Sequence, residues 1–368
     1  MTGKTLYWND LGVKAETALF APEGKTAEMH AMLHVETKDM SFCEQYNCIL
    51  KAEQRLSEAF NGGKIMMRRY FVSDIANQKS LMAAESNIPT SIIQQSPLDG
   101  SKIAAWVYMV GGEPNYRHRW NLGLNCNEGS SYEQTNKLLT ELEQTYAKED
   151  GSSIGSHCIR TWFFVRDIDT QYEGMVDARR ENFTEVGLTA DTHYLASTGI
   201  QGIPADQKSI IQLDAYSIDD IQPEQQTYLY AKSHLNPTFE YGVTFERGTK
   251  VDYADRSHIF ISGTASINNK GEVVHIGDIK LQTQRMWENV DALLAEGGAN
   301  KNDIMQMIVY LRDIADYDTV SQMFATRFPD TPCVITLAPV CRPTWLIEME
   351  CIAIVNNSDN GKTQIRDF

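Results

Sequence analysis

Residues 307–314 read MIVYLRDI, an apolar run that stops at an acidic residue. β-Branched and aromatic side chains dominate this run, which is typical of a strand inside a sheet. Two earlier segments repeat the pattern and end in the same Asp-Ile pair: MMRRYFVSDI at 66–75 and IRTWFFVRDI at 159–168. A short repeat of this kind can arise once by chance, but a third occurrence in similar surroundings is less expected. We therefore predict three related units in one chain.

The surroundings of the three runs are also alike. A segment with apolar residues at helical spacing precedes each run. These helices are expected at residues 42–60, 132–146 and 281–295. An apolar strand follows each Asp-Ile pair after a further helix or turn, at residues 102–110, 209–216 and 346–355. The recurring order of helix, strand, helix or turn, and strand predicts an α+β fold.

The repeat divides the chain into three expected units, at residues 1–115, 116–222 and 223–368. The N-terminal unit is the most degenerate, and the C-terminal unit has the clearest pattern. The alternative is a single genuine domain at residues 255–356 with two unrelated segments that imitate it. The mass in solution separates these interpretations, because a chain that contains all three units has no need of partner subunits.

Composition and charge narrow the class of function. The chain has 368 residues with 42% hydrophobic side chains, which is enough for a substantial core, and a formal net charge of −16. An acidic surface repels phosphates, and the basic pairs Arg68-Arg69 and Arg179-Arg180 are isolated. We therefore predict no nucleic-acid partner, and an anionic substrate would depend on local arginines.

The seven cysteines form no C-x-x-C pair, which argues against a disulfide framework and against structural zinc. His30 and His34 lie on one face of an expected strand without a third ligand nearby, so no metal is predicted. Phosphate-binding glycine motifs are absent, and we expect no cofactor. The N-terminus lacks the pattern of a signal peptide, and no apolar stretch is long enough to span a membrane. These features predict a reduced, cytoplasmic protein that does not bind membranes.

The C-terminal unit resembles the Rid/YjgF family. The resemblance rests on four segments in the family's order: IFISGTASI at 259–267, a helix that begins near Gln282, VYLRD at 309–313 and IEMECIA at 347–353. It implies a fold like that of chorismate mutase, with a sheet and two helices on one face. Family members assemble as trimers with sites in the clefts between subunits. Three such units in one chain would form a covalent pseudo-trimer, so we expect a monomer rather than a homotrimer.

One departure bears on the family's deaminase activity. Enamine and imine deaminases of this family hold the substrate carboxylate with an Arg two residues before a Cys. Cys333 matches that Cys, but Thr331 occupies the Arg position. Arg327 lies four residues earlier and is a candidate to replace that Arg. The standard deaminase interpretation is therefore weakened.

Chorismatases, which have a Rid-like C-terminal half, fit the remaining motifs better. The segment CRPTWLIE at 341–348 is similar to their C-terminal motif, and SGTAS at 262–266 also matches. Arg160-Thr161-Trp162 resembles part of a second motif, although two phenylalanines follow it. The resemblance implies cleavage of the enol-pyruvyl ether of chorismate, or of a related small anionic metabolite, to pyruvate plus a hydroxybenzoate or dihydrodiol. An enamine or imine deaminase, or an inactive ligand-binding protein, is the alternative.

Cleaving an enol ether requires a proton donor, and a carboxylic acid with a raised pKa can serve. Glu348 is the candidate, because period-2 alternation places it on one strand face with Glu350 and apolar neighbours. The alternative is a solvated strand end.

The other candidates are substrate-binding residues. Arginine binds carboxylates bidentately, and the alternative for each candidate arginine is a surface ion pair. The candidates are Arg160, Arg327, Arg342, Tyr241, Cys341 as a wall of the site, and Gly263. Within the resemblance, Cys341 together with Gly263 indicates the branch that forms 3-hydroxybenzoate.

Overall fold

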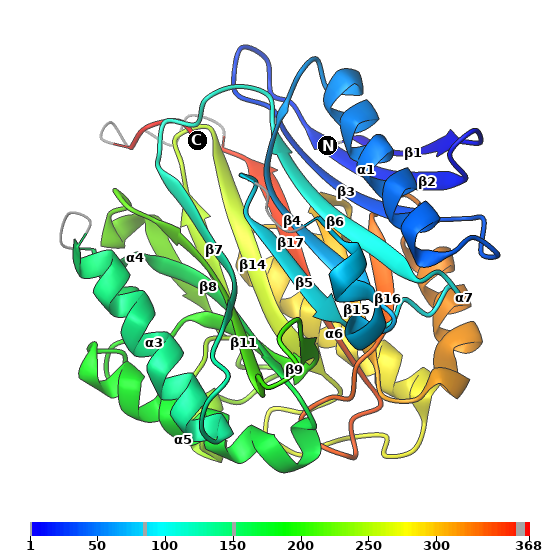
Figure 1. Cartoon of the computed structure of the whole chain (residues 1–368). Coiled ribbons are helices and arrows are strands. Elements are labelled where there is room, and N and C mark those ends of the chain that lie inside the picture. The colour runs from blue at the N-terminus through cyan, green and yellow to red at the C-terminus, as the bar shows by residue number, and fades with distance from the viewer. Residues whose placement is uncertain (1, 84–86, 149–151, 358–364) are drawn as a thin grey trace.

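The computed structural model describes residues 2–83, 87–148, 152–357 and 365–368, apart from the side chain of Tyr241. Within these ranges the chain is α+β, as predicted, and its strands form three sheets. Figure 1 shows the strands toward the middle of the molecule and the long helices outside them. Five short 3-10 helices complete the elements: η1 Lys79–Leu81, η2 Pro223–Gln225, η3 Thr238–Tyr241, η4 Lys301–Asp303 and η5 Ile314–Asp316.

The first sheet has seven strands in the order β1-β2-β3-β6-β4-β5-β10. Their bounds are β1 Thr2–Trp8, β2 Val13–Phe20, β3 Glu28–Val35, β4 Lys64–Val72, β5 Thr90–Gln94, β6 Ile103–Val110 and β10 Ile203–Pro204. Helix α1 (Phe42–Ala59) contacts β3 and β6, and α2 (Ile75–Gln78) follows β4. A capping box between Ser41 and Glu44 starts α1, and Ile49 and Leu56 are fully buried on its inner face.

The second sheet has four strands in the order β7-β11-β8-β9. Their bounds are β7 His118–Asn125, β8 Cys158–Val165, β9 Ala196–Gln201 and β11 Ile211–Ile218. Its helices are α3 (Ser131–Lys148), α4 (Ile154–His157) and α5 (Ile168–Glu185), and α3 packs along α5.

The third sheet has six strands in the order β12-β13-β14-β17-β15-β16. Their bounds are β12 Gln226–Leu229, β13 Gly248–Asp252, β14 Arg256–Ala265, β15 Ile304–Leu311, β16 Cys333–Leu337 and β17 Ile347–Asn356. Helix α6 (Ile279–Glu296) contacts β14 and β17, and α7 (Tyr317–Arg327) contacts α6.

The same pairing occurs in all three sheets. The strand in each repeated run pairs in parallel with the strand that follows it and antiparallel with the last strand of its unit. These strands end two residues before the repeated Asp, earlier than the sequence suggested. The three Asp residues, Asp74, Asp167 and Asp313, instead occupy N-cap positions of the following helices. The tandem arrangement of related units is thus visible in both sequence and topology.

The three sheets share one apolar core. Trp106 of β6, Trp162 of β8 and Phe260 of β14 are all buried in it, and the two indole rings lie 6.2 Å apart. Strand β10 comes from the middle of the chain but pairs with β5 of the first sheet. The exact unit boundaries at 115 and 222 therefore stay a prediction. None of the helices within the described ranges is long and apolar enough to cross a membrane.

Candidate functional site

A pocket lies where the second and third sheets meet. Helix α5 and strand β9 form one side, β14 and β17 form the other, and two connecting loops complete it. The lining residues are Tyr172, Arg179, Ser197, Thr198, Gly199, Val243, Phe245, Arg247, Gly263, Ala265, Ile267, Cys341, Arg342, Trp345 and Glu348. The cavity volume is ≈ 50 Å³, which is room for a few water molecules. A larger ligand requires one of the loops to move.

Glu348 provides the acid of this pocket. The alternation of β17 turns it inward, and its side chain is only 5% exposed, so it is not a solvated strand end. Burial, and then the negative charge of Glu350, raise the pKa of Glu348 to about 8, although Arg160 and Arg247 oppose the rise. Near neutral pH the carboxyl is therefore largely protonated. Its environment suits a proton donor.

Gly263 lets the Glu348 carboxyl lie against the backbone of β14. A Cβ at position 263 would be 2.2 Å from Oε1 of Glu348 and 3.0 Å from Cγ2 of Thr198. No side chain fits there without displacing the carboxyl. The φ of Gly263 is not positive, so its backbone conformation does not require glycine. Glycine is required here because the Glu348 carboxyl lies so close to the backbone.

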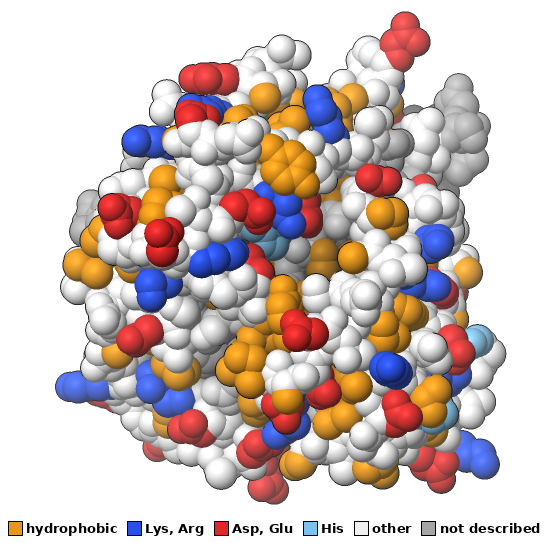
Figure 2. All heavy atoms as spheres, turned by 90° about the vertical axis from the view of Figure 1, so that its right-hand side faces the viewer, with side chains coloured by type: hydrophobic (Ala, Val, Ile, Leu, Met, Phe, Trp, Pro, Cys, Tyr) orange, Lys and Arg blue, Asp and Glu red, His pale blue; other side chains and the backbone are white. Residues whose placement is uncertain are grey.

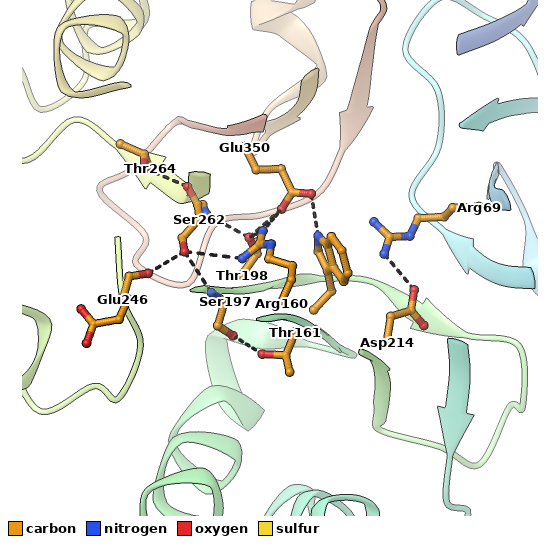
Figure 3. Close-up of polar contacts among 12 residues, drawn as sticks. Arg69, Arg160, Thr161, Ser197, Thr198, Asp214, Glu246, Ser262, Thr264 and Glu350 are labelled. Atoms are coloured by element: carbon orange, nitrogen blue, oxygen red, sulfur yellow. Dashed lines mark hydrogen bonds and ion pairs between the residues drawn. The ribbon is translucent and has the colours of Figure 1, made fainter. Parts of the chain in front are cut away.

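Glu350, two residues along the same strand face, is held by a buried polar network. Nη2 of Arg160 donates to it at 2.8 Å, Nε1 of Trp162 at 2.6 Å and Oγ1 of Thr198 at 2.6 Å. Figure 3 shows Arg160 and Thr198 pointing toward Glu350 from the second sheet. The network fixes Glu350, whose charge adds to the effect of burial in raising the pKa of Glu348. The backbone N–H of Gly263 also donates to Thr198, which ties the pocket wall to the network.

Three guanidinium groups line the pocket, against the single acid Glu348 among the described lining residues. Arg179 of α5 is buried and donates to Thr244 and Ser197. Arg247 is also buried and donates to the Asn236 carbonyl. This local excess of positive charge, within a chain of net charge −16, makes the pocket suited to an anion.

The loop from Cys341 to Trp345 closes one end of the pocket. Burial, and then the charge of Glu348, raise the pKa of Cys341 to about 12, so the thiol stays neutral and forms a wall rather than a nucleophile. Arg342 lies over the Trp345 ring, 5.2 Å from its centroid. The Trp345 indole donates to the Ser266 carbonyl, which anchors the loop on the third sheet.

The structure brings together some of the predicted site residues and separates others. Glu348, Gly263, Cys341 and Arg342 all line the pocket, and Arg160 lies behind it, bound to Glu350. Arg327 lies apart on α7. Its guanidinium forms an ion pair with Asp291 at 2.5 Å and lies over the Trp287 and Phe328 rings. The side chain of Tyr241 lies outside the described residues.

Arg179, Arg247 and Tyr172 were not identified as site residues from the sequence. Arg179 did carry a signal, because it lies four residues from both Met175 and Phe183 on the buried face of α5. A charged residue on an apolar helix face requires a buried partner or ligand. Arg247 has no comparable local pattern. Within the described ranges, no cluster of three or more potential ligands is arranged to hold a metal ion.

The C-terminal third of the chain is similar in sequence to known proteins. The family model described as Endoribonuclease L-PSP matches residues 250–355. A RutC family protein from Pyrococcus abyssi is 39% identical over 98 residues, which is 26% of this chain and 76% of that protein. The 3-aminoacrylate deaminase RutC of Acinetobacter baylyi is 31% identical over 101 residues, or 26% of this chain and 79% of the relative.

A solved structure extends the similarity over more of the chain. The crystal structure of a chorismatase superposes with a TM-score of 0.62 and 19% identity, covering 78% of this chain and 92% of that one. At this identity the superposition establishes a common fold. With the sequence matches over the third sheet, it shows that this chain is a member of the Rid/YjgF family whose overall fold is shared with chorismatase.

Proposed function

We propose that this protein is a chorismatase-like enzyme that cleaves the enol-pyruvyl ether of chorismate, or of a closely related small carboxylate. The observation that carries the proposal is a buried, largely protonated Glu348 in a pocket with three arginines. A neutral carboxylic acid supplies the proton that an enol ether needs, and guanidinium groups hold the substrate carboxylates.

The chemistry follows from these groups. Glu348 transfers its proton to the terminal vinyl carbon of the enol ether, which leaves an oxocarbenium-like centre on the adjacent carbon. Water, or a ring hydroxyl of the substrate, adds to that centre. In the water route the hemiketal breaks its bond to the ring oxygen, which takes the second proton of the water, so pyruvate and the ring alcohol are released. In the ring-hydroxyl route the bond between that oxygen and the ring breaks, the ring loses a proton and becomes aromatic, and the ether oxygen takes that proton as its bond to the pyruvate carbon breaks. The deprotonated Glu348 recovers a proton from the added nucleophile, so the cycle is balanced without a cofactor.

Arg179 on α5, Arg247 just before β13 and Arg342 on the loop before β17 all line the pocket. We propose that they hold the substrate carboxylates, while Arg160 acts through Glu350 rather than on the substrate. Because the cavity is ≈ 50 Å³, the loop that carries Cys341 and Arg342 must open for a chorismate-sized ligand. The presence of Cys and Gly at positions 341 and 263 favours formation of the hydroxybenzoate over the dihydrodiol.

The main alternative is an enamine or imine deaminase, the activity named for the Acinetobacter relative. A protonated Glu348 would also serve that reaction. However, Thr331 and Cys333, which match the deaminase carboxylate site, line a different cleft from Glu348. A ligand-binding protein without catalysis is the third possibility, and it would keep the arginine pocket.

The deciding experiment is incubation of the purified chain with chorismate and continuous measurement of pyruvate by a coupled dehydrogenase. We expect pyruvate release from the wild type and its loss in Glu348→Gln, with Glu58→Gln as the control at an exposed position. No pyruvate from the wild type would refute the proposal. Release of ammonia from 2-aminoacrylate under the same conditions would favour the deaminase alternative.

We also propose that the protein is a cytoplasmic monomer, in which the three units replace the subunits of a trimer. The seven cysteines are all free thiols, which suits a reducing compartment. Light scattering should give the mass of one chain, 41.6 kDa. A stable trimer in solution would contradict the pseudo-trimer.

A further inference from the structure

A second cleft lies between the first and third sheets and has a volume of ≈ 290 Å³. Strands β2 and β3 form one side, and β15, β16 and α7 form the other. Its volume is close to the lower end of the range for small-molecule sites, roughly 300–1,000 Å³. Figure 2 shows side chains of both charges gathered around the hollow on this face of the molecule. Among the described residues, none lines both this cleft and the Glu348 pocket.

A buried histidine lies between two carboxylates at the floor of this cleft. Nδ1 of His34 is 3.3 Å from Asp99 and Nε2 is 3.7 Å from Glu16. Burial alone would lower the pKa of His34, but the hydrogen bond to Asp99 and the nearby carboxylate of Glu16 outweigh burial and raise it to about 9. The imidazole is therefore charged at neutral pH. Glu16 also accepts from the backbone N–H of Cys333 at 3.0 Å, which joins the two sides of the cleft.

The remaining charged lining residues, Lys14 and Glu36, lie on β2 and just after the end of β3. Lys14 is opposite His34 in the strand register and pairs with Glu16 at 2.9 Å, while the exposed Glu36 follows two residues after His34 on the same face. Lys38 pairs with Asp99 at 3.4 Å behind the floor.

The charged lining residues are two cations and three anions, and Lys38, paired with Asp99 beside the cleft, brings the cations to three, so the region is close to neutral in a strongly acidic protein. A ligand with charges of both signs and no net charge matches it better than a simple ion.

The opposite wall of the cleft is apolar. Tyr317, Phe324 and Phe328 follow one another at helical spacing on and just after α7, and Met307 and Ile335 continue the surface. Such a wall binds an aliphatic or aromatic group by excluding water from it.

We propose that this cleft binds a zwitterionic α-amino acid with an apolar side chain. Its ammonium group would contact Glu36, its carboxylate Lys14, and its side chain the wall on α7. Glu16, Asp99 and His34 form a charged floor, in which the ion pair with Glu16 keeps Lys14 in position. The site is independent of the chemistry at Glu348, because the two sets of lining residues do not overlap.

The test uses L-leucine and L-phenylalanine as probes of the full chain, with binding followed by calorimetry and ligand-observed NMR. Isopentylamine and 4-methylpentanoate, which each lack one charge of leucine, serve as matched analogues. We expect both amino acids to bind and each analogue to bind about tenfold more weakly, because one charged contact is lost.

Variants locate the site. Glu36→Gln should weaken the binding of leucine about tenfold. Ser321→Phe, which fills the cleft from α7, should abolish it. Glu23→Gln, at an exposed position away from the cleft, is the control for Glu36→Gln, and Glu348→Gln should leave binding unchanged.

The outcomes are distinct from those of the chorismate assay. The absence of binding by either amino acid at millimolar concentration would overturn the proposal, as would equal binding of an analogue or unchanged binding in Ser321→Phe. Competition by chorismate that depends on Glu348 would place the amino acid in the other pocket and would also overturn it. Loss of chorismate cleavage alone has no bearing on this cleft.

Discussion

Replacing Glu348 by Gln should make the protein more stable at alkaline pH while removing its proton donor. The pKa of Glu348 is raised from 4.5 to about 8 in the folded protein. Between these values the folded state binds more protons at this carboxyl than the unfolded chain, so the wild type loses stability as the pH rises from 4.5 to about 8. Below this window the carboxyl is protonated in both states and its burial carries no ionisation cost.

The size of the effect follows from the shift. Raising the pKa from 4.5 to about 8 corresponds to about 5 kcal/mol, at ~1.4 kcal/mol for each pH unit. Because the carboxyl borders a pocket large enough for water, solvent screening should reduce this to roughly 2–3 kcal/mol. Glutamine keeps the shape and a hydrogen-bonding amide, but it cannot ionise.

Urea unfolding of the wild type and Glu348→Gln at about pH 5 and about pH 9 measures the difference directly. We expect similar midpoints at about pH 5 and a higher midpoint for the variant at about pH 9. Glu58→Gln, which changes an exposed carboxylate, controls for the loss of one negative charge. A variant that is equally stable relative to the wild type at both values, or less stable at the higher one, would refute a raised pKa at Glu348.

Three further substitutions test the surroundings. Gly263→Ala puts a methyl group 2.2 Å from Oε1 of Glu348, so pyruvate release should be lost. The substitution should also lower the stability by about 1–3 kcal/mol, measured by thermal melting. Retained activity would argue against the close approach. Arg160→Met leaves the buried Glu350 carboxylate without its cation, with Trp162 and Thr198 as its remaining donors. It should cost roughly 3–5 kcal/mol in urea unfolding, whereas the double variant with Glu350→Gln should recover part of the loss. The pKa of His34 is raised from 6.5 to about 9, so its stabilisation is complete below 6.5 and disappears as the pH rises through about 9. His34→Asn should therefore lower the stability by up to about 3 kcal/mol at about pH 6 and much less at about pH 10; equal losses at both values would contradict the charged floor.

Some features of the site were accessible from the sequence because they depend on local periodicity. Alternation along residues 346–355 placed Glu348 and Glu350 on one face, and the structure confirms this arrangement with both side chains buried. The repeated Asp was a reliable landmark, but it marks the start of a helix rather than the end of a strand. When a helix follows a strand directly, the sequence does not show whether an aspartate between them ends the strand or begins the helix.

Other features depend on which distant segments meet. Arg160 was expected to contact the substrate, and the structure places it behind the pocket, paired with Glu350, a residue 190 positions away. Arg179 and Arg247 enter the pocket from a helix and a connecting segment of different units. The segment with Thr331 and Cys333, adjacent in sequence to the Glu348 loop, faces another cleft.

The sequence alone thus determined the α+β class, the threefold repetition and the strand face of Glu348, because helical and strand periodicities are set by near neighbours. Only the tertiary structure decided which arginines surround Glu348, that Gly263 gives its carboxyl room, and that His34 is charged between Glu16 and Asp99. These are consequences of burial and of contacts between the three sheets. Burial removes water from a group and exposes it to charges from remote segments, and this combination sets its pKa and its chemistry.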